Sequence, residues 1–324
     1  MIYSRIAGTG SQLPDKVVTN KDLEKFMDTS DQWIRDRTGI EERRVIVDGE
    51  STATLTLAAC QKAMEAAQVD PAEIDLFVLG TTTPDLIFPS TACLIQKKLG
   101  LGDCGAMDVN AACSGFLYAL SIADKYIRCG DAKKVLVGGA ETLTQLLNWK
   151  KRDTAVLFGD GAGAVVLEAS ETPGILSTHI HADGSYADLL TTNVGVSLGF
   201  DGMEENEGKP EISMRGNEVF KVAVRTLHRI VDETLSANNV DKSELDWLIP
   251  HQANYRIISA TAKMLDMDMD QVVVTVNRHG NTSAASVPLA LDEAVRDGRV
   301  KRGQLLLLEA FGGGFTWGSA LIRY

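Results

Sequence analysis

Three polar side chains in this chain are of the types that together carry out acyl transfer through a thioester. Cys113 lies in the segment NAACSGF, between an apolar strand-like run and a long amphipathic segment. His251 lies in the segment PHQAN and Asn281 in HGNTS. A thiol at the start of a helix meets the positive end of the helix dipole, which favours the nucleophilic thiolate. The sequence therefore predicts a covalent acyl intermediate on Cys113.

The composition limits the class of protein. The chain has 324 residues, of which 44% are hydrophobic and 23% charged, an ordinary balance for a globular protein. A formal net charge of -12 argues against nucleic-acid binding and means that an anionic partner would need a local basic patch. No apolar run approaches the roughly 20 residues that span a bilayer. The N-terminus is too short and polar for a signal peptide, so we expect a cytoplasmic protein without a membrane span.

The remaining cysteines and histidines favour structural roles. Four cysteines form no CxxC pair and are expected to be inert thiols in a reducing compartment: Cys60, Cys93, Cys104 and Cys129. His179 and His181 would face the same side of an extended strand, but strand histidines usually fill a surface, so no metal site is expected. His279 is expected to be a capping or core histidine.

The chain contains an internal repeat. Three pairs of segments are similar at offsets of 171, 168 and 170 residues: 69–79 with 240–250, 126–131 with 294–299, and 134–138 with 304–308. Three similarities in the same order at a nearly constant offset predict two pseudo-symmetric α/β halves, 1–170 and 171–324.

Each half alternates strands with helices. The expected strands are 106–109, 135–137, 164–167, 247–249, 272–276 and 305–308, and the expected helices are 53–67, 115–129, 219–237, 257–265 and 286–296. This alternation predicts right-handed crossovers and mainly parallel sheets. The acidic, glycine-containing segment 193–210 has no periodicity and is expected to be an exposed loop.

Cys113, His251 and Asn281 each follow an expected strand. The repeat offset places Cys113 opposite residues 281–284, in the equivalent strand-to-helix turn of the second half. Ligands of such sheets gather beyond the carboxyl ends of the strands. We therefore expect the three side chains to meet in one cleft between the two halves.

Two glycine-rich segments suggest different roles. The segment FGDGAG (158–163) leads into a strand, whereas a dinucleotide or phosphate loop requires a following helix N-terminus. A cofactor-binding role is therefore not expected there. The segment FGGGF (311–315) follows a buried strand, and its glycines could bring backbone N–H groups close to a ligand. An oxyanion site and a tight structural turn are both open interpretations of this segment.

These motifs, together with DTSDQWI (28–34) and RTGI (37–40), resemble the β-ketoacyl-acyl carrier protein synthase III family. The similarity runs from about residue 2 to residue 324. The resemblance implies a thiolase-like α/β fold whose two pseudo-symmetric halves form a five-layered α-β-α-β-α core. It also implies that the chain is an acyltransferase.

The resemblance implies a decarboxylative Claisen condensation of an acyl-CoA primer, expected to be acetyl-CoA, with malonyl-acyl carrier protein. The products are a 3-oxoacyl-acyl carrier protein, coenzyme A and carbon dioxide, and the reaction initiates fatty acid biosynthesis. Cys113 would attack the primer thioester, and His251 and Asn281 would hold the malonyl thioester oxygen. The backbone N–H groups of Cys113 and Gly313 would form a second oxyanion site. No metal or other cofactor is implied.

Binding residues follow from the same resemblance. Six residues are expected to contact coenzyme A: Trp33, Arg37, Thr38, Arg152, Gly216 and Asn254. Trp33 and Arg152 would sandwich the adenine ring. Phe88 would shape the acyl pocket of a homodimer partner. Three basic residues would bind the acidic carrier protein: Lys221, Arg256 and Lys263. Met264 departs from the family pattern, which often has a second lysine there, and Ser114 replaces a common alanine.

Three other functions use some of the same residue types. A cysteine peptidase or amidase would also need Cys, His and Asn, but its cysteine typically lies near the N-terminus of a secreted mature chain. An acyl-CoA or carrier-protein binding module would need no nucleophile. Another acyl-CoA-primed condensing enzyme of the thiolase superfamily, from a polyketide, alkylquinolone or long-chain olefin pathway, would differ in its pocket length and malonyl donor.

Overall fold

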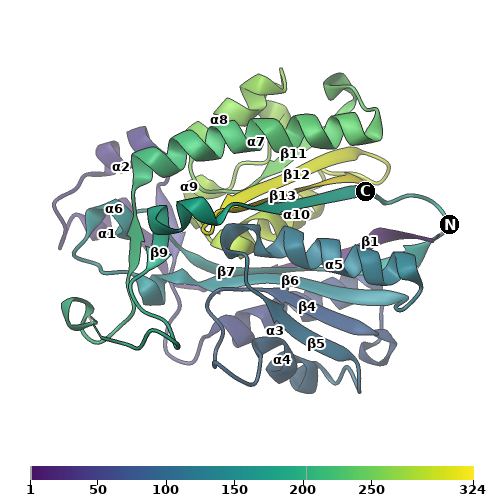
Figure 1. Ribbon diagram of the computed structural model, residues 1–324, viewed down its shortest axis with the longest axis horizontal. Coiled ribbons are helices and arrows are strands. Elements are labelled where there is room, and N and C mark those ends of the chain that lie inside the picture. Colours follow the sequence, from purple (N-terminus) through teal and green to yellow (C-terminus); the bar gives the residue numbers. More distant parts are fainter. Residues whose placement is uncertain (1, 202) are drawn as a thin grey trace.

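This computed structural model describes residues 2–201 and 203–324. Two β-sheets with similar strand arrangements form the centre of the molecule (Figure 1). The first sheet has the order β1-β7-β6-β4-β5. Its strands are β1 (Tyr3–Gln12), β7 (Asp160–Ser170), β6 (Lys134–Thr142), β4 (Leu76–Gly80) and β5 (Gly105–Val109). Strand β4 runs parallel to β5 and β6, whereas β7 runs antiparallel to β1 and β6.

The second sheet repeats this pattern. Its order is β11-β12-β13-β8, with β11 (Trp247–Pro250), β12 (Leu305–Gly312), β13 (Thr316–Arg323) and β8 (Ile175–Ala182). Strand β11 runs parallel to β12, and β13 runs antiparallel to both β12 and β8. Each strand thus corresponds to one in the first sheet, as the internal repeat predicts. The division of the chain at residue 170 stays a prediction.

The sheets are mixed, so the expectation of mainly parallel sheets is wrong. Strands β7 and β13 each run antiparallel to both of their neighbours. The three residues between β12 and β13 allow only a hairpin, because a parallel connection needs a crossover of a dozen or more residues.

The expected strand 272–276 is also wrong. Only Val272 pairs with β11, through an isolated parallel bridge to Leu248, and the short helix α9 (Val276–His279) begins where the strand was expected to end. Here the buried Gln252 side chain makes hydrogen bonds to the backbone of this segment, as a neighbouring β-strand would otherwise do. Its Oε1 accepts the N–H groups of Thr275 and Val276 at 2.8 and 3.1 Å, and its Nε2 donates to a backbone carbonyl of the same segment. The apolar residues of this segment are therefore buried without a β ladder.

The long helices make the five layers. Helices α3 (Thr52–Ala67) and α4 (Thr91–Leu99) cover the outer face of the first sheet, and α7 (Gly216–Asn238) and α8 (Tyr255–Met264) cover that of the second (Figure 1). Helices α5 (Gly115–Cys129) and α10 (Ser286–Arg296) lie between the two sheets. This arrangement confirms the predicted α-β-α-β-α core.

Shorter elements complete the chain. They are α1 (Asn20–Leu23), α2 (Asp31–Thr38), α6 (Arg152–Ala155), β2 (Val17–Thr19), β3 (Glu42–Arg44), β9 (Leu190–Thr192) and β10 (Ile212–Met214). Strands β9 and β10 pair with each other and flank the predicted loop 193–210, in which Leu198 is 91% exposed. Residue 202 of this loop lies outside the described residues. No helix in the described ranges has the length and apolar character needed to cross a membrane.

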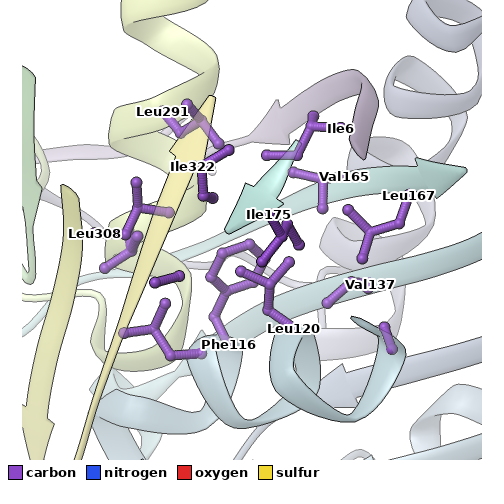
Figure 2. Close-up of a cluster of buried hydrophobic side chains, with 14 of the residues drawn as sticks. Ile6, Phe116, Leu120, Val137, Val165, Leu167, Ile175, Leu291, Leu308 and Ile322 are labelled. Carbon is purple, nitrogen blue, oxygen red and sulfur yellow. The ribbon is translucent and has the colours of Figure 1, made fainter. Parts of the chain in front are cut away.

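The core between the sheets holds the two halves together. It contains buried side chains from both halves, among them Phe116 and Val165 from the first and Leu308 and Ile322 from the second (Figure 2). Burying each such side chain contributes roughly 1.5–3 kcal/mol. Since Phe116 belongs to the first turn of α5, this core also anchors the segment that carries Cys113.

Candidate active site

A pocket of about 430 Å³ brings Cys113, His251 and Asn281 together. The first half contributes the cysteine and the second half the other two residues. Cys113 follows β5 and His251 follows β11, whereas Asn281 follows the short helix α9. Other residues that line the pocket include Trp33, Arg37, Thr38, Leu190, Gly216, Phe220, Asn254, Arg256, Ile257, Phe311 and Gly312. The spatial convergence expected from the sequence is therefore present.

Cys113 lies in a tight turn directly before α5. The turn is a 3₁₀ segment (Ala112–Ser114), and the cysteine is 7% exposed. Gly312, at the end of β12, lies against it. A Cβ atom at Gly312 would lie 2.5 Å from the backbone nitrogen of Cys113. The glycine-rich turn of the second half thus packs directly on the backbone of the cysteine.

Burial opposes the thiolate that the sequence predicts for Cys113. It raises the pKa of the thiol to about 12, although a hydrogen bond with Ser283 offsets part of that effect. A rise of this size corresponds to about 4 kcal/mol against the thiolate. The helix dipole typically contributes about 0.3–1 kcal/mol. Burial is therefore the larger effect, and the resting cysteine is a neutral thiol.

Alkylation of Cys113 should report this neutral thiol. We expect its rate constant with iodoacetamide to rise about tenfold per pH unit between pH 8 and 10, without a plateau, because only the thiolate reacts. The alkylated peptide would be measured by mass spectrometry, with Cys113→Ala as the control for the exposed Cys129. A plateau below pH 9 would show that the dipole outweighs burial.

His251 is held as a neutral imidazole with one free nitrogen. Burial lowers its pKa to about 3. Its Nδ1 lies 2.6 Å from the Ser286 hydroxyl oxygen, which also accepts the backbone N–H of Gln252 at 3.3 Å. Because Ser286 accepts from that N–H, its own hydrogen can be donated to Nδ1. In the tautomer in which the Ser286 hydroxyl donates to Nδ1, the ring hydrogen resides on Nε2, where it can be donated to a ligand.

Asn281 is fixed so that its amide nitrogen remains for a ligand. Its Oδ1 accepts the backbone N–H of Ser283 at 2.9 Å. Its own backbone bonds to both Leu157 and Gly159, at 2.8 and 3.0 Å. Gly159 passes so close to the carbonyl oxygen of His279 that a side chain would not fit. The glycine-rich segment 158–163 therefore packs against the Asn281 turn and continues as strand β7.

The expected adenine contacts lie at one end of the pocket. The guanidinium carbon of Arg152 lies 4.3 Å from the Trp33 ring centroid, and that of Arg37 lies 4.5 Å from the same centroid. Arg152 also donates to the backbone oxygen of Asp28 at 2.9 Å. The tryptophan is thus already covered by arginine, and an adenine ring would have to displace one of these side chains to be sandwiched.

Other expected coenzyme A residues line the pocket but are engaged locally. Asn254 caps α8 by accepting the N–H of Arg256 at 2.9 Å, and its Nδ2 donates to the backbone oxygen of Arg37 at 3.0 Å. The Thr38 hydroxyl donates to the backbone oxygen of Ile34 at 2.7 Å. Gly216 begins α7. The amide of Asn254 therefore joins two walls of the pocket rather than pointing freely into it.

The residues expected to meet macromolecular partners lie at the surface. Lys221 on α7 and Lys263 on α8 are exposed, and so is Arg256, whose guanidinium carbon lies 5.3 Å from the Phe220 ring centroid. Phe88 is 84% exposed in the single chain. Met264 is partly buried against the hydrophobic core under α8, where a lysine would lose apolar contacts. These positions leave the partner roles as predictions.

Sequence reasoning assigned no role to three polar residues near the cysteine: Glu141, Ser283 and Ser286. Ser283 and Ser286 belong to the HGNTS motif and its extension, but their side-chain contacts were not foreseen. The sequence does contain one feature that could have drawn attention to Glu141, since this carboxylate directly follows the apolar run VLVGGA. Among the described residues, no cluster of three His, Cys, Asp or Glu side chains could hold a metal ion. Instead, His179 and His181 both contact Glu233.

Comparison with known proteins agrees with this geometry. Family models of 3-oxoacyl-(acyl-carrier-protein) synthase III match residues 107–184, and its C-terminal model matches residues 235–324. The chain is 69% identical to the beta-ketoacyl-acyl-carrier-protein synthase III of Xanthomonas campestris pv. campestris, covering 100% of this chain and 99% of that protein. It is 67% identical to the Xylella fastidiosa protein of the same name, again over 100% and 99% of the two chains.

A solved structure extends the similarity to the fold. The crystal structure of 3-oxoacyl-acyl-carrier-protein synthase III from Aquifex aeolicus superposes with a TM-score of 0.93 at 48% identity, covering 99% of this chain and 100% of that chain. Five layers and a cysteine-containing pocket between two similar halves define a thiolase-like acyltransferase. The chain belongs to the 3-oxoacyl-(acyl-carrier-protein) synthase III family of condensing enzymes.

Proposed function

We propose that the chain catalyses the decarboxylative Claisen condensation of acetyl-CoA with malonyl-acyl carrier protein, the step that initiates fatty acid biosynthesis. The observation that carries this proposal is the meeting of Cys113, His251 and Asn281 in one pocket. There, the histidine and the asparagine each retain a hydrogen-bond donor after their structural bonds are made.

The first half-reaction is transfer of the acetyl group to Cys113. The sulfur attacks the thioester carbonyl, a new carbon–sulfur bond forms, and the bond to coenzyme A breaks. The Cys113 thiol gives up its proton as it attacks, and coenzyme A gains a proton and leaves as the thiol, so the step is balanced. The backbone N–H groups of Cys113 and Gly313 would stabilise the negative oxygen of the intermediate, and Gly312 already places this turn against the cysteine.

The second half-reaction makes the carbon–carbon bond. His251 Nε2–H and Asn281 Nδ2–H would donate to the malonyl thioester oxygen while carbon dioxide leaves, which stabilises the enolate. The enolate carbon then attacks the acetyl-cysteine, and the thiolate of Cys113 is released. A neutral His251 suits this role because it donates a hydrogen bond without needing a proton from solvent.

Two exposed regions of the surface would bind the carrier protein and a second copy of the chain. The basic residues of α7 and α8, Lys221, Arg256 and Lys263, would receive the acidic carrier protein at the pocket mouth. A homodimer would cover the free edge of β5 and the exposed side chains of Leu86, Ile87 and Phe88. Five free cysteines in the chain suit a cytoplasmic location.

Acylation by defined substrates tests this function. Incubation with acetyl-CoA, followed by peptide mass spectrometry, should place an acetyl group on Cys113 and none on the Cys113→Ala variant. Adding malonyl-acyl carrier protein should then release 3-oxobutyryl-acyl carrier protein, whereas malonyl-CoA should be a poor donor. Preferential acylation by long-chain acyl-CoA would instead indicate a condensing enzyme of another pathway. A chain that forms no acyl-cysteine at all would refute the proposal.

A further inference from the structure

Arg43 is a fully buried cation to which the proposed condensation gives no role. It lies in the middle of β3 and is 0% exposed. In the described part of the chain, no carboxylate lies within ion-pair distance of its guanidinium, and neutral oxygens accept its hydrogen bonds. Its Nε–H has no hydrogen-bond partner among these residues. Burying a charge in this way is costly to the fold, which favours a functional reason for the arginine.

The two terminal nitrogens of Arg43 bond to different parts of the molecule. Nη1 donates to the backbone oxygen of Val18 at 3.1 Å and to Oδ1 of Asn20 at 2.9 Å. Nη2 donates to the backbone oxygen of Val156 at 2.7 Å, the shortest of the three bonds. Burial lowers the pKa of the guanidinium to about 10, so the group stays charged at neutral pH. The arginine thus joins the two-stranded sheet of β2 and β3 to the segment that follows α6.

The segment 156–159 holds the backbone of Asn281. The N–H of Asn281 donates to the carbonyl oxygen of Leu157 at 2.8 Å, and its own carbonyl oxygen accepts the N–H of Gly159 at 3.0 Å. Residues 156–158 also line the pocket. The Val156 carbonyl group that Arg43 binds is therefore directly bonded, in the chain, to the first residue that holds Asn281.

Arg43 also packs directly against the turn that carries Asn281. A Cβ atom at Gly280 would lie 3.1 Å from the Cβ of Arg43, and a Cβ atom at Gly159 would lie 3.2 Å from it. Helix α9, which directly precedes Gly280, packs against β3. The arginine therefore supports the Asn281 turn in two ways, by its hydrogen bond to Val156 and by its contact with the two glycines.

We propose that Arg43 is a positioning residue for the condensation half-reaction, in which it keeps the Asn281 carboxamide aimed at the malonyl thioester oxygen. The inference rests on the proposed function. Oδ1 of Asn281 accepts the N–H of Ser283, so the place of Nδ2 depends on where the backbone of this turn is held. A donor stabilises the enolate only in the correct position, and a displacement of about 1 Å can cost about 10²-fold in rate.

Acetylation of Cys113 should not depend on Arg43. The cysteine is anchored by Phe116 in the core between the sheets and by its contact with Gly312, and no hydrogen bond of Arg43 reaches this region. A merely structural arginine would change the fraction of folded enzyme, and both half-reactions would then fall in proportion. A positioning role instead affects the second half-reaction alone.

Release of labelled carbon dioxide from malonyl-acyl carrier protein, measured per acetylated Cys113, tests the inference. Acetylation at saturating acetyl-CoA counts the folded sites. Arg43→Met should acetylate within about threefold of the wild-type rate but decarboxylate at least about tenfold more slowly. The loss should appear in kcat, with the KM for malonyl-acyl carrier protein nearly unchanged, because the donor acts on the developing enolate.

A double variant and a matched control identify the path. If Arg43 acts through Asn281, Arg43→Met should add less than about twofold to the loss already present in Asn281→Ala. Arg128→Met is the control, since Arg128 likewise donates to backbone oxygens, those of Ile175 and Leu176 at 2.7 and 3.2 Å, near the C-terminal end of α5. Decarboxylation per acetylated site should stay within about twofold of wild type in this control.

The outcomes separate this inference from the function on which it rests. Wild-type enzyme that is not acetylated at Cys113 refutes both. Normal wild-type turnover with unchanged decarboxylation in Arg43→Met refutes only the positioning role, as does a loss that is equal in both half-reactions or that adds in full to Asn281→Ala. If Arg43→Met does not fold, Arg43→Lys decides the question, because lysine keeps the charge but has one nitrogen in place of the planar fork. Unchanged decarboxylation in Arg43→Lys also refutes the role.

Discussion

His251→Ala should lose condensation while Cys113 is still acetylated at a nearly normal rate. The imidazole Nε2–H is the donor that remains after Ser286 has taken Nδ1, and it would act on the enolate oxygen of the malonyl substrate. Removing one such donor costs about 10²–10³ in rate, or roughly 3–4 kcal/mol. Asn281→Ala should show the same pattern, because its Nδ2 is the second donor to that oxygen.

The half-reactions would be measured separately. Acetylation is followed by mass spectrometry of the Cys113 peptide, and decarboxylation by release of labelled carbon dioxide from malonyl-acyl carrier protein. His179→Ala is a suitable control, since that histidine lies on β8, contacts Glu233 of α7 and does not line the pocket. Variants that lost acetylation first would show that His251 and Asn281 act on the nucleophile instead.

The neutral state of His251 adds a pH dependence to this prediction. Its pKa is lowered by burial to about 3, so the imidazole stays neutral throughout the range from pH 5 to 9. Decarboxylation by the acetyl-enzyme should therefore show no inflection near pH 6.5, the ordinary pKa of histidine. Such an inflection, lost in His251→Ala, would show that a charged imidazole is the working form.

Gly312→Ala should reduce condensation about 100-fold or more and destabilise the protein. The added Cβ would lie 2.5 Å from the backbone nitrogen of Cys113 and 3.0 Å from its Cβ. Backbone atoms cannot rotate away, so the turn or the start of α5 has to shift. Overpacking of this kind costs about 1–3 kcal/mol of stability, and a displacement of about 1 Å at a reacting group can cost 10²-fold in rate.

Thermal unfolding and Cys113 acetylation would be measured on the same Gly312→Ala preparation. Gly184→Ala is the matched control, because a Cβ there would have no neighbour within 4 Å. It should leave both quantities unchanged. Wild-type acetylation in Gly312→Ala would mean that the glycine-rich turn can move away from the cysteine without affecting the chemistry.

Local patterns in the amino-acid sequence are enough to predict much of this enzyme. Helices predicted at 115–129 and 286–296 match the bounds of α5 and α10, because their apolar faces repeat with the helical period. The near-constant offset between similar segments predicts two equivalent sheets. It also places Cys113 and Asn281 in equivalent turns, so their meeting can be expected from strand order alone.

Features that depend on distant contacts could not be predicted in this way. The segment 272–276 forms no β ladder because the Gln252 side chain makes hydrogen bonds to its backbone. The contact of Arg152 with the Trp33 ring depends on helix α6, which lies more than a hundred residues further along the chain. The charge states of the site belong to the same group. The position of Cys113 at the start of a helix is a local property, and it favours the thiolate. Burial of Cys113 is produced by both halves together, and it raises the pKa of the thiol so that the neutral form is favoured.

The order of residues along the chain thus specified which groups are present and at which strand ends they lie, since motifs and hydrophobic periods are local. Packing of one half against the other set their protonation and their free hydrogen-bond donors. It also brought Ser283, from the second half, within hydrogen-bond distance of Glu141 of the first, at 3.2 Å. Solvation and cross-chain contacts are properties of the folded molecule, and no single segment carries them.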